Sequence, residues 1–263
     1  MKKSFSENGY LIVKNAISKN LISEIQNEIY HILKIKNKNN SKKYNHFSNL
    51  VKKSKVKEYN FTKKIFEHLL YKGLIKKMFL EKKFNKSIID ILGKDLAFCT
   101  DPGITLNIPE KADSKKNYLF KDWHQEIWSG ASPSTIQIWT PLIHKTSENG
   151  QMQIIKDSHK WGHVPHRNRK PIKLPKKFKT TQLKLNYGDV IIFSTLLLHR
   201  SLPTEFTRLS FPCLLKNFKA KDNSFQDIRS FHNYSFSEIT KIERILGNHF
   251  LSPFRLSKLD DID

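Results

Sequence analysis

The chain is poor in cysteine and has no long apolar run. Its 263 residues include two cysteines, Cys99 and Cys213, which are too few for a disulfide framework and have no metal-ligand spacing between them. We expect both to be buried free thiols in a reduced compartment. No apolar run reaches membrane-spanning length, and Met1-Lys2-Lys3 is followed by polar residues where a signal peptide needs an apolar block. The sequence therefore predicts a soluble, cytoplasmic protein without a membrane span.

Acidic residues are also scarce. The chain has 24 Asp and Glu residues but 47 Lys and Arg residues, which gives a formal net charge of +23. Such a charge is compatible with nucleic acid, an anionic membrane or an anionic substrate as partner. The lysines are scattered among polar residues and form no single block, which favours a compositional bias. No alternation of aromatic and basic residues supports nucleic-acid binding. Charge alone assigns no partner, and the sequence does not indicate the oligomeric state.

Hydrophobic periodicity changes near residue 95. Before it, apolar residues recur at helical spacing over residues 19–34, 61–79 and 86–92, and Gly73 weakens the middle of the second helix. After it, the period is that of strands, and the candidates are 96–99, 104–108, 135–142, 151–155, 181–185, 190–193 and 209–215. Short strands bounded by turn residues predict a sandwich or barrel. We therefore expect a mainly β fold of the α+β class, with the N-terminal helices packed on one sheet.

The length suits one domain with a sizeable core. We expect a single domain over residues 1–263, with a mostly helical part at 1–95, a β core at 96–217 and an extension at 218–263 that holds a helix near 237–246. Residues 36–57, rich in Lys, Asn and Ser, predict an exposed loop. Residues 156–180, with three prolines and several basic residues, predict a long loop over a site.

One short motif places two metal-ligand types together. His124 and Glu126 are two residues apart, so on an extended strand both side chains lie on the same side, while Gln125 points to the other face for packing. His199, at the end of the apolar run 190–198, is the best candidate for a third ligand. Two histidines and a carboxylate bind Fe(II) on one face and leave positions open for substrate and oxygen. The same ligands also suit a zinc hydrolase.

Further segments accompany this motif in a definite order. They are residues 7–13, 123–126, 136–142, 149–152, 157–162, 188–190 and 198–201, followed by Arg208. With these segments, the chain resembles the phytanoyl-CoA dioxygenase family of Fe(II)- and 2-oxoglutarate-dependent oxygenases. The resemblance extends from near the N-terminus to about Asn217 and does not cover residues 218–263. It implies a double-stranded β-helix, which is a jelly-roll barrel.

The resemblance also implies roles for individual residues. His124, Glu126 and His199 would bind iron, and Arg208 with Ser201 would hold the distal carboxylate of 2-oxoglutarate. A planar guanidinium fits a carboxylate through two hydrogen bonds. Further residues that the resemblance places beside the cosubstrate are Trp139, Thr105 and Asn107. The family more commonly has Asp at the position of Glu126, and Gly-Ser-His where this chain has Asp157-Ser158-His159.

The expected activity couples oxidative decarboxylation of 2-oxoglutarate by O2 to hydroxylation of an unactivated carbon in a small molecule, with release of succinate and CO2. An anionic substrate would suit the basic residues of the loop over the site, namely Arg167, Arg169, Lys170 and Lys173 with His163 and His166. His144 and His159 are further candidates for substrate contacts, although solvent exposure or structural hydrogen bonding is commoner for each. A jelly-roll protein that binds a ligand without turnover and a zinc hydrolase are the alternatives, and Arg208 argues against hydrolysis.

Overall fold

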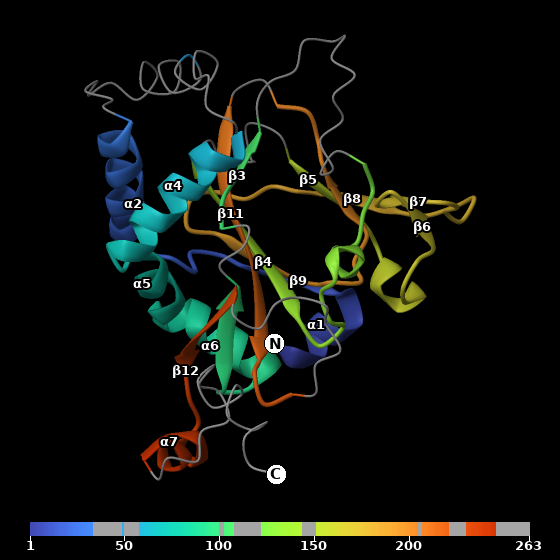
Figure 1. The fold of residues 1–263 in the computed structure, drawn as a ribbon. Coiled ribbons are helices and arrows are strands. Elements are labelled where there is room, and N and C mark those ends of the chain that lie inside the picture. The colour runs from blue at the N-terminus through green and yellow to red at the C-terminus, as the bar shows by residue number, and fades with distance from the viewer. Residues whose placement is uncertain are drawn as a thin grey trace, which may run out of the picture.

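The structure is a computed structural model that describes residues 1–33, 49, 58–99, 103–107, 122–143, 151–204, 207–220 and 230–245. Its helices cover one side of a twisted sheet, and a smaller sheet lies on the other side (Figure 1). Several expected features lie outside the described residues, namely most of the loop 36–57, His144 and the turn Asn149-Gly150. None of the helices in the described part is long and apolar enough to cross a membrane.

The N-terminal helices follow the predicted periodicity closely. Ser18 caps the helix predicted to start at residue 19, because its Oγ accepts a hydrogen bond from the Leu21 amide at 3.4 Å. Gly73, at φ 71°, divides the second predicted helix into two. A helix before residue 9 was not predicted. The helices are α1 (Lys2–Asn8), α2 (Lys19–Ile32), α4 (Glu58–Tyr71), α5 (Leu74–Leu80), α6 (Lys82–Leu92) and, near the C-terminus, α7 (Glu238–Ile245).

The larger sheet is antiparallel, with the strand order β1-β9-β4-β11-β2-β12, and β3 also pairs with β11. The strands β2, β3, β4, β9 and β11 confirm predicted ones to within two residues at each end, whereas β12 was not predicted. Their bounds are β1 (Tyr10–Val13), β2 (Leu96–Cys99), β3 (Thr105–Asn107), β4 (Ile136–Ile143), β9 (Val190–Ser194), β11 (Arg208–Asn217) and β12 (Phe231–Ser235).

Both faces of the larger sheet are covered, which explains why its central strands read as continuous apolar runs. Because side chains alternate along a strand, Ile138 and Ile192 point to the helix side and join the main core. Trp139, Ile191 and Phe193 point the other way and join a second core. The sequence thus builds one sheet with a helical layer on one side and a β layer on the other, as expected.

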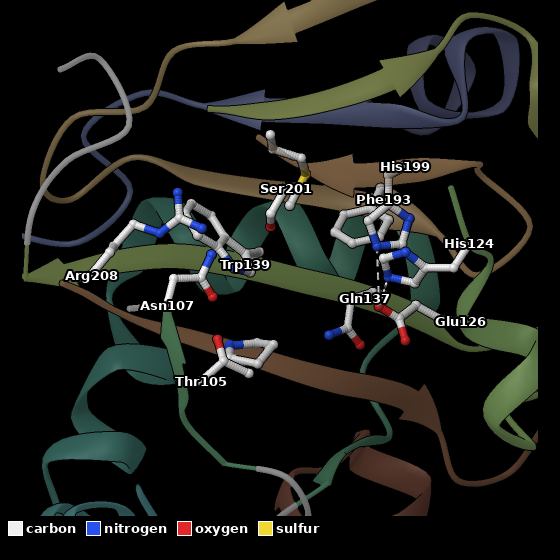
Figure 2. A pocket seen from close by; sticks show the side chains of 12 residues that line it. Thr105, Asn107, His124, Glu126, Gln137, Trp139, Phe193, His199, Ser201 and Arg208 are labelled. Atoms are coloured by element: carbon white, nitrogen blue, oxygen red, sulfur yellow. Dashed lines mark ion pairs between the residues drawn. The ribbon is translucent and has the colours of Figure 1, made fainter. Parts of the chain in front are cut away.

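The smaller sheet faces this second core and has the order β10-β5-β8, with bounds β5 (Met152–Ile155), β8 (Thr180–Leu183) and β10 (His199–Ser201). A pocket lies between the two sheets and is lined from both (Figure 2). The described strands do not close into one barrel. The layered arrangement of a jelly roll is nevertheless present. The division of the chain at residues 95 and 217 stays a prediction.

The segment 156–180 is more ordered than the long loop we predicted. It contains a 3-10 helix, η2 (Ser158–Trp161), and a short hairpin of β6 (His166–Arg167) and β7 (Lys170–Pro171). Asn168 and Arg169 form the hairpin turn with positive φ values of 50° and 59°, which suit the tight turns that match the twist of a hairpin. Part of the expected loop is therefore a folded hairpin.

One turn far from the pocket fastens the first strand to the larger sheet. The Asp189 carboxylate is buried and accepts hydrogen bonds from Lys14 Nζ at 2.8 Å and from the amides of Asn15 and Asn186 at 2.9 Å each. Gly188 precedes it at φ 82°, and a Cβ there would meet the Ile17 carbonyl oxygen at 2.5 Å. This turn requires glycine and an acceptor side chain, which the Gly188-Asp189 pair supplies.

Candidate metal centre and its pocket

Backbone pairing brings the two candidate histidine ligands together. The His124 amide donates to the His199 carbonyl at 3.0 Å, and the His199 amide donates back to the His124 carbonyl at 3.1 Å. The stretch around His124 is an isolated bridge rather than the regular strand we predicted, and Glu126 already begins a 3-10 helix, η1 (Glu126–Ser129). Gln125 keeps an extended conformation, with φ −115° and ψ 142°. His124 and Glu126 therefore still lie on the same side.

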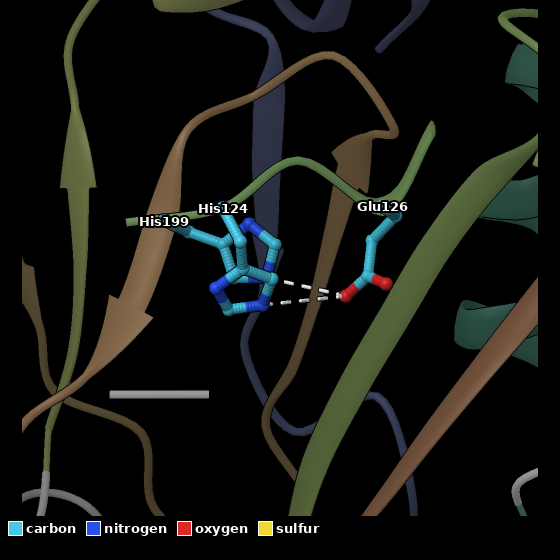
Figure 3. Close-up of side chains that lie close together, drawn as sticks. All are labelled: His124, Glu126 and His199. Atoms are coloured by element: carbon cyan, nitrogen blue, oxygen red, sulfur yellow. Dashed lines mark ion pairs between the residues drawn. The ribbon is translucent and has the colours of Figure 1, made fainter. Parts of the chain in front are cut away.

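The three side chains converge on one point (Figure 3). Glu126 Oε1 lies 3.2 Å from His199 Nε2 and 4.0 Å from His124 Nε2. Each histidine donates its Nδ1 proton to a carbonyl, that of Asp122 at 2.8 Å and that of Leu197 at 3.0 Å. A carbonyl only accepts, so both rings direct the Nε2 atom toward the cluster. Such second contacts fix ligand rings in metal sites.

Burial and mutual charge set the protonation of the cluster. Burial, helped by the charge of His199, lowers the pKa of His124 to about 4. Burial alone would raise the pKa of Glu126, but the hydrogen bond and charge of His199 hold it below its ordinary value. At neutral pH His124 is therefore neutral and Glu126 anionic. These are the forms in which a histidine and a carboxylate bind a metal ion.

Gln125 ties the metal motif to its surroundings, a role beyond the packing we predicted. Its Nε2 donates to the carbonyls of Gly162 at 2.9 Å and Leu196 at 2.5 Å, and its Oε1 accepts from the Val164 amide at 2.9 Å. The side chain is 1% exposed. Gln125 thus joins the His124–Glu126 stretch to two neighbouring loops. Its position between the ligands was the only sequence signal for this role.

Ser158 supports the other histidine. Its Oγ accepts from the Leu198 amide at 2.9 Å and donates to the Ile155 carbonyl at 2.8 Å, which fixes the backbone just before His199. Asp157 precedes it with φ 61°, the left-handed conformation that glycine adopts easily. The turn therefore keeps the conformation of a glycine, although Asp stands there in this chain.

A second link joins the ligand-bearing segments outside the cluster. The Arg200 guanidinium lies 4.5 Å from the ring centroid of Trp123, and Arg200 Nε donates to Gln153 Oε1 at 2.8 Å. Trp123 and Arg200 are the sequence neighbours of His124 and His199. This cation–π contact therefore braces the two segments from the side opposite the ligands.

The cluster lies at one end of the pocket between the sheets (Figure 2). All five residues that the resemblance placed beside the cosubstrate line the same pocket as the three ligands. Further lining residues were not predicted and are Gln137, Met152, Phe193 and Pro212. Strand alternation explains the set, because Arg208 and Pro212 share the pocket face of β11, while Phe211 points to the helix side.

Arg208 is a buried cation at the far end of this pocket. It is 1% exposed, and neither its Nε nor its Nη1 makes a hydrogen bond within the part of the chain that the structure describes. Its guanidinium carbon lies 5.1 Å from the ring centroid of Trp139. Burial lowers its pKa to about 10, so it stays charged at neutral pH. A buried charge is costly unless an anion pairs with it, so the site fits a carboxylate ligand.

The polar wall beside Arg208 comes from β3. Asn107 is the cross-strand partner of Arg208, and Thr105 is the partner of Ser210, with 2.8 Å between the two hydroxyl oxygens. Ser201 reaches the pocket from β10 in the opposite sheet. Hydrogen-bonding groups from both sheets therefore line the pocket that holds the guanidinium.

The basic hairpin is fastened beside the metal motif. Lys170 Nζ forms an ion pair with Asp122 at 2.6 Å, and the His166 ring stacks on Trp128 with 4.6 Å between ring centroids. The positive charge of Arg169 contributes to lowering the pKa of Glu126. His159 has a structural contact instead, since its Nε2 donates to the Ser6 carbonyl at 3.1 Å.

Two histidines and a carboxylate around one point, in a layered jelly roll with a buried arginine in the same pocket, are the arrangement expected of a 2-oxoglutarate-dependent non-haem oxygenase. The chain belongs to the phytanoyl-CoA dioxygenase (PhyH) family, which matches residues 5–210. Membership confirms the expected resemblance and makes the protein an enzyme of the Fe(II)- and 2-oxoglutarate-dependent class. A search of curated proteins gave no match.

Solved structures share the fold at low sequence identity. The non-haem monooxygenase ThoJ, in its apo form, is 15% identical with a TM-score of 0.60, over 90% of this chain and 84% of that one. EvdO2 from Micromonospora carbonacea var. aurantiaca is 13% identical with a TM-score of 0.54, over 86% and 92%. The epimerase SnoN, solved with Fe3+, alpha ketoglutarate and nogalamycin RO, is 13% identical with a TM-score of 0.51, over 82% of each chain.

Proposed function

We propose that the protein hydroxylates an unactivated carbon of a small, anionic metabolite, with oxidative decarboxylation of 2-oxoglutarate to succinate and CO2. In this proposal His124, Glu126 and His199 bind Fe(II). The observation that carries it is Arg208, a buried guanidinium without a hydrogen-bonded partner among the described residues at Nε and Nη1, in the same pocket as the ligand cluster. A keto diacid that spans from metal to arginine would satisfy both ends.

Residues at different places in the pocket have different proposed roles. Fe(II) bound at the cluster would supply the oxygen chemistry. Arg208 and Ser201 hold the distal carboxylate of 2-oxoglutarate, because guanidinium and hydroxyl both donate. Trp139 forms the apolar wall, and Thr105 and Asn107 offer polar contacts beside it. Because the pocket lies between the two sheets, both sheets help to exclude water from it.

Relatives support this assignment over the alternatives. SnoN was solved with Fe3+ and alpha ketoglutarate together, which are the two groups that this pocket suits. A zinc hydrolase with the same ligands would have no use for a buried arginine at the far end of the pocket, because hydrolysis needs no keto-acid anchor. The arginine therefore favours an oxygenase.

The β6–β7 hairpin supports the anionic character of the substrate. Arg169 lies at the turn of the hairpin, and its positive charge contributes to lowering the pKa of both His124 and Glu126. The ion pair between Lys170 and Asp122 holds the hairpin next to the metal motif. A carboxylate or phosphate that approaches the metal from the side of the hairpin would meet the positive charge of Arg169.

The test is oxygen-dependent succinate formation by the Fe(II)-loaded protein, with a panel of small carboxylates and phosphates and their neutral analogues. We expect an anionic compound to stimulate succinate formation above the level without substrate, and its hydroxylated product to appear in equal amount. Arg169→Gln should raise the KM for that compound more than it lowers kcat. Arg167→Gln removes the same charge from the same hairpin and is the matched control. Stimulation by neutral analogues alone would contradict the anionic assignment.

A further inference from the structure

Gln137 lines the pocket and is polar, but it has no role in the function proposed above. It lies on β4, two residues before Trp139, so both side chains point to the pocket, while Ile136 and Ile138 point to the main core. Gln137 is 6% exposed. Its side chain extends from β4 toward the metal end of the pocket, near Glu126 (Figure 2).

The amide oxygen of Gln137 is buried and makes no hydrogen bond with any described residue. An acceptor that is removed from water without a donor costs free energy, so buried amides nearly always meet a partner in the protein, a water molecule or a ligand. The neighbouring strands provide apolar side chains at this level, since Phe193 on β9 and Leu214 on β11 are the cross-strand partners of Gln137. The pocket, which Gln137 lines, is therefore where a donor can reach this oxygen.

The metal end of the pocket is where a donor is expected. Fe(II) bound by His124, Glu126 and His199 would leave room for the cosubstrate and for a water molecule. Water on a divalent ion is a stronger hydrogen-bond donor than bulk water, because the ion lowers its pKa. A neutral amide accepts this bond without competing with Glu126 as a charged ligand.

We propose that Gln137 is a positioning residue that hydrogen-bonds the water at the open metal position and so keeps oxygen from that position until substrate arrives. This inference rests on the proposed function. The Gln137 oxygen would accept a hydrogen bond from this water while cosubstrate is bound, and would lose that partner when substrate binds. The amide thereby limits decarboxylation of 2-oxoglutarate in the absence of substrate.

The experiment adds Fe(II) and 2-oxoglutarate to the full-length protein without oxygen and compares wild type with Gln137→Met, which keeps the length of the side chain but accepts only weakly. Near-infrared magnetic circular dichroism separates six-coordinate from five-coordinate Fe(II). We expect a six-coordinate wild-type complex and loss of the water in the variant. Nitric oxide, which competes for the same position, should bind the variant roughly fivefold more tightly, as expected for one lost neutral hydrogen bond.

Gln182→Met is the control, because Gln182 is an exposed glutamine that does not line the pocket. It should leave coordination unchanged. Gln137→Asn, with a side chain one methylene shorter, serves as a second variant that keeps the polarity and should also lose the water. A wild-type protein without the Fe(II)–2-oxoglutarate chelate would overturn the proposed function and this inference together. A normal chelate with identical coordination and nitric oxide affinity in wild type and both Gln137 variants would overturn this inference alone.

Discussion

The two ends of the pocket are built in opposite ways. At the metal end, the backbones of His124 and His199 pair with each other, both Nδ1 atoms have carbonyl acceptors, and the Glu126 carboxylate faces both Nε2 atoms. At the other end, Arg208 is buried with two nitrogen atoms that no described residue bonds. The metal end is thus complete in geometry before any ligand binds. The arginine end is complete only when an anion binds, which is why we propose that it selects the cosubstrate.

The largest effect should come from removing a ligand at the ordered end. His199→Ala deletes one of the three proposed metal ligands, and we expect Fe(II) binding and succinate formation to fall to background. Calorimetric metal titration and an assay of coupled turnover measure the two effects. Circular dichroism confirms that the backbone bridge to His124 still folds. Turnover at the wild-type rate would remove His199 from the ligand set.

A substitution at the arginine end should weaken cosubstrate binding without changing metal binding. Arg208→Met keeps much of the volume and removes the charge, so 2-oxoglutarate binding should weaken by about 2–5 kcal/mol, the usual loss for one partner of a buried charge pair. Fe(II) binding without cosubstrate should not change. Isothermal titration of each ligand tests the separation. Equal weakening of both would mean that the two ends are not independent.

Gln125→Leu should affect the metal end without touching a ligand. The substitution leaves the Gly162 and Leu196 carbonyls and the Val164 amide without their partner. We expect metal affinity to fall about 10–100-fold, as for other residues that orient ligands, and the free energy of unfolding to fall by about 1–3 kcal/mol. Gln182→Leu, at an exposed glutamine, is the control. Unchanged metal affinity would show that the ligands need no such support.

The smallest effect on the site should come from Asp189, which stabilises the scaffold rather than the pocket. Burial alone would raise its pKa, but bonds from Lys14 and two amides hold the pKa below the ordinary value. A depressed folded pKa means stability that is present above the unfolded value of about 3.9 and is lost as pH falls through the folded value. Asp189→Asn should therefore lower the free energy of unfolding by about 2 kcal/mol at pH 7.

Urea denaturation from pH 7 to pH 3 measures this difference. The gap between wild type and Asp189→Asn should shrink as the wild-type carboxylate protonates, while 2-oxoglutarate affinity at pH 7 stays the same. A gap that is constant with pH would mean that the charge of Asp189 does not contribute. A large loss of cosubstrate affinity would mean that the turn and the pocket are coupled.

The sequence predicts the regular elements well because their apolar patterns are strong. The strands of the larger sheet and the convergence of His124, Glu126 and His199 follow from alternation and from the order of motifs. Features that depend on contacts between distant segments were missed. The three bonds of Gln125 join loops 37 and 71 residues away. No local pattern encodes such pairings.

Other misses have local causes. The helix α1 has few apolar residues to show a period, and the hairpin β6–β7 has strands too short to alternate. The stretch at His124 was predicted as a strand because only its side-chain spacing was visible, whereas Glu126 turns into a 3-10 helix. Barrel closure depends on which strand edges pair, and sequence patterns of single strands do not specify edges.

The most direct measurement is an anaerobic titration of the metal-free protein with Fe(II) and 2-oxoglutarate, followed by the visible charge-transfer band of the chelate. We predict a band in the wild-type protein, a band that needs far more 2-oxoglutarate in Arg208→Met, and no band in His199→Ala. A folded wild-type protein that binds Fe(II) but gives no band at saturating 2-oxoglutarate would contradict the assignment of this pocket to the cosubstrate.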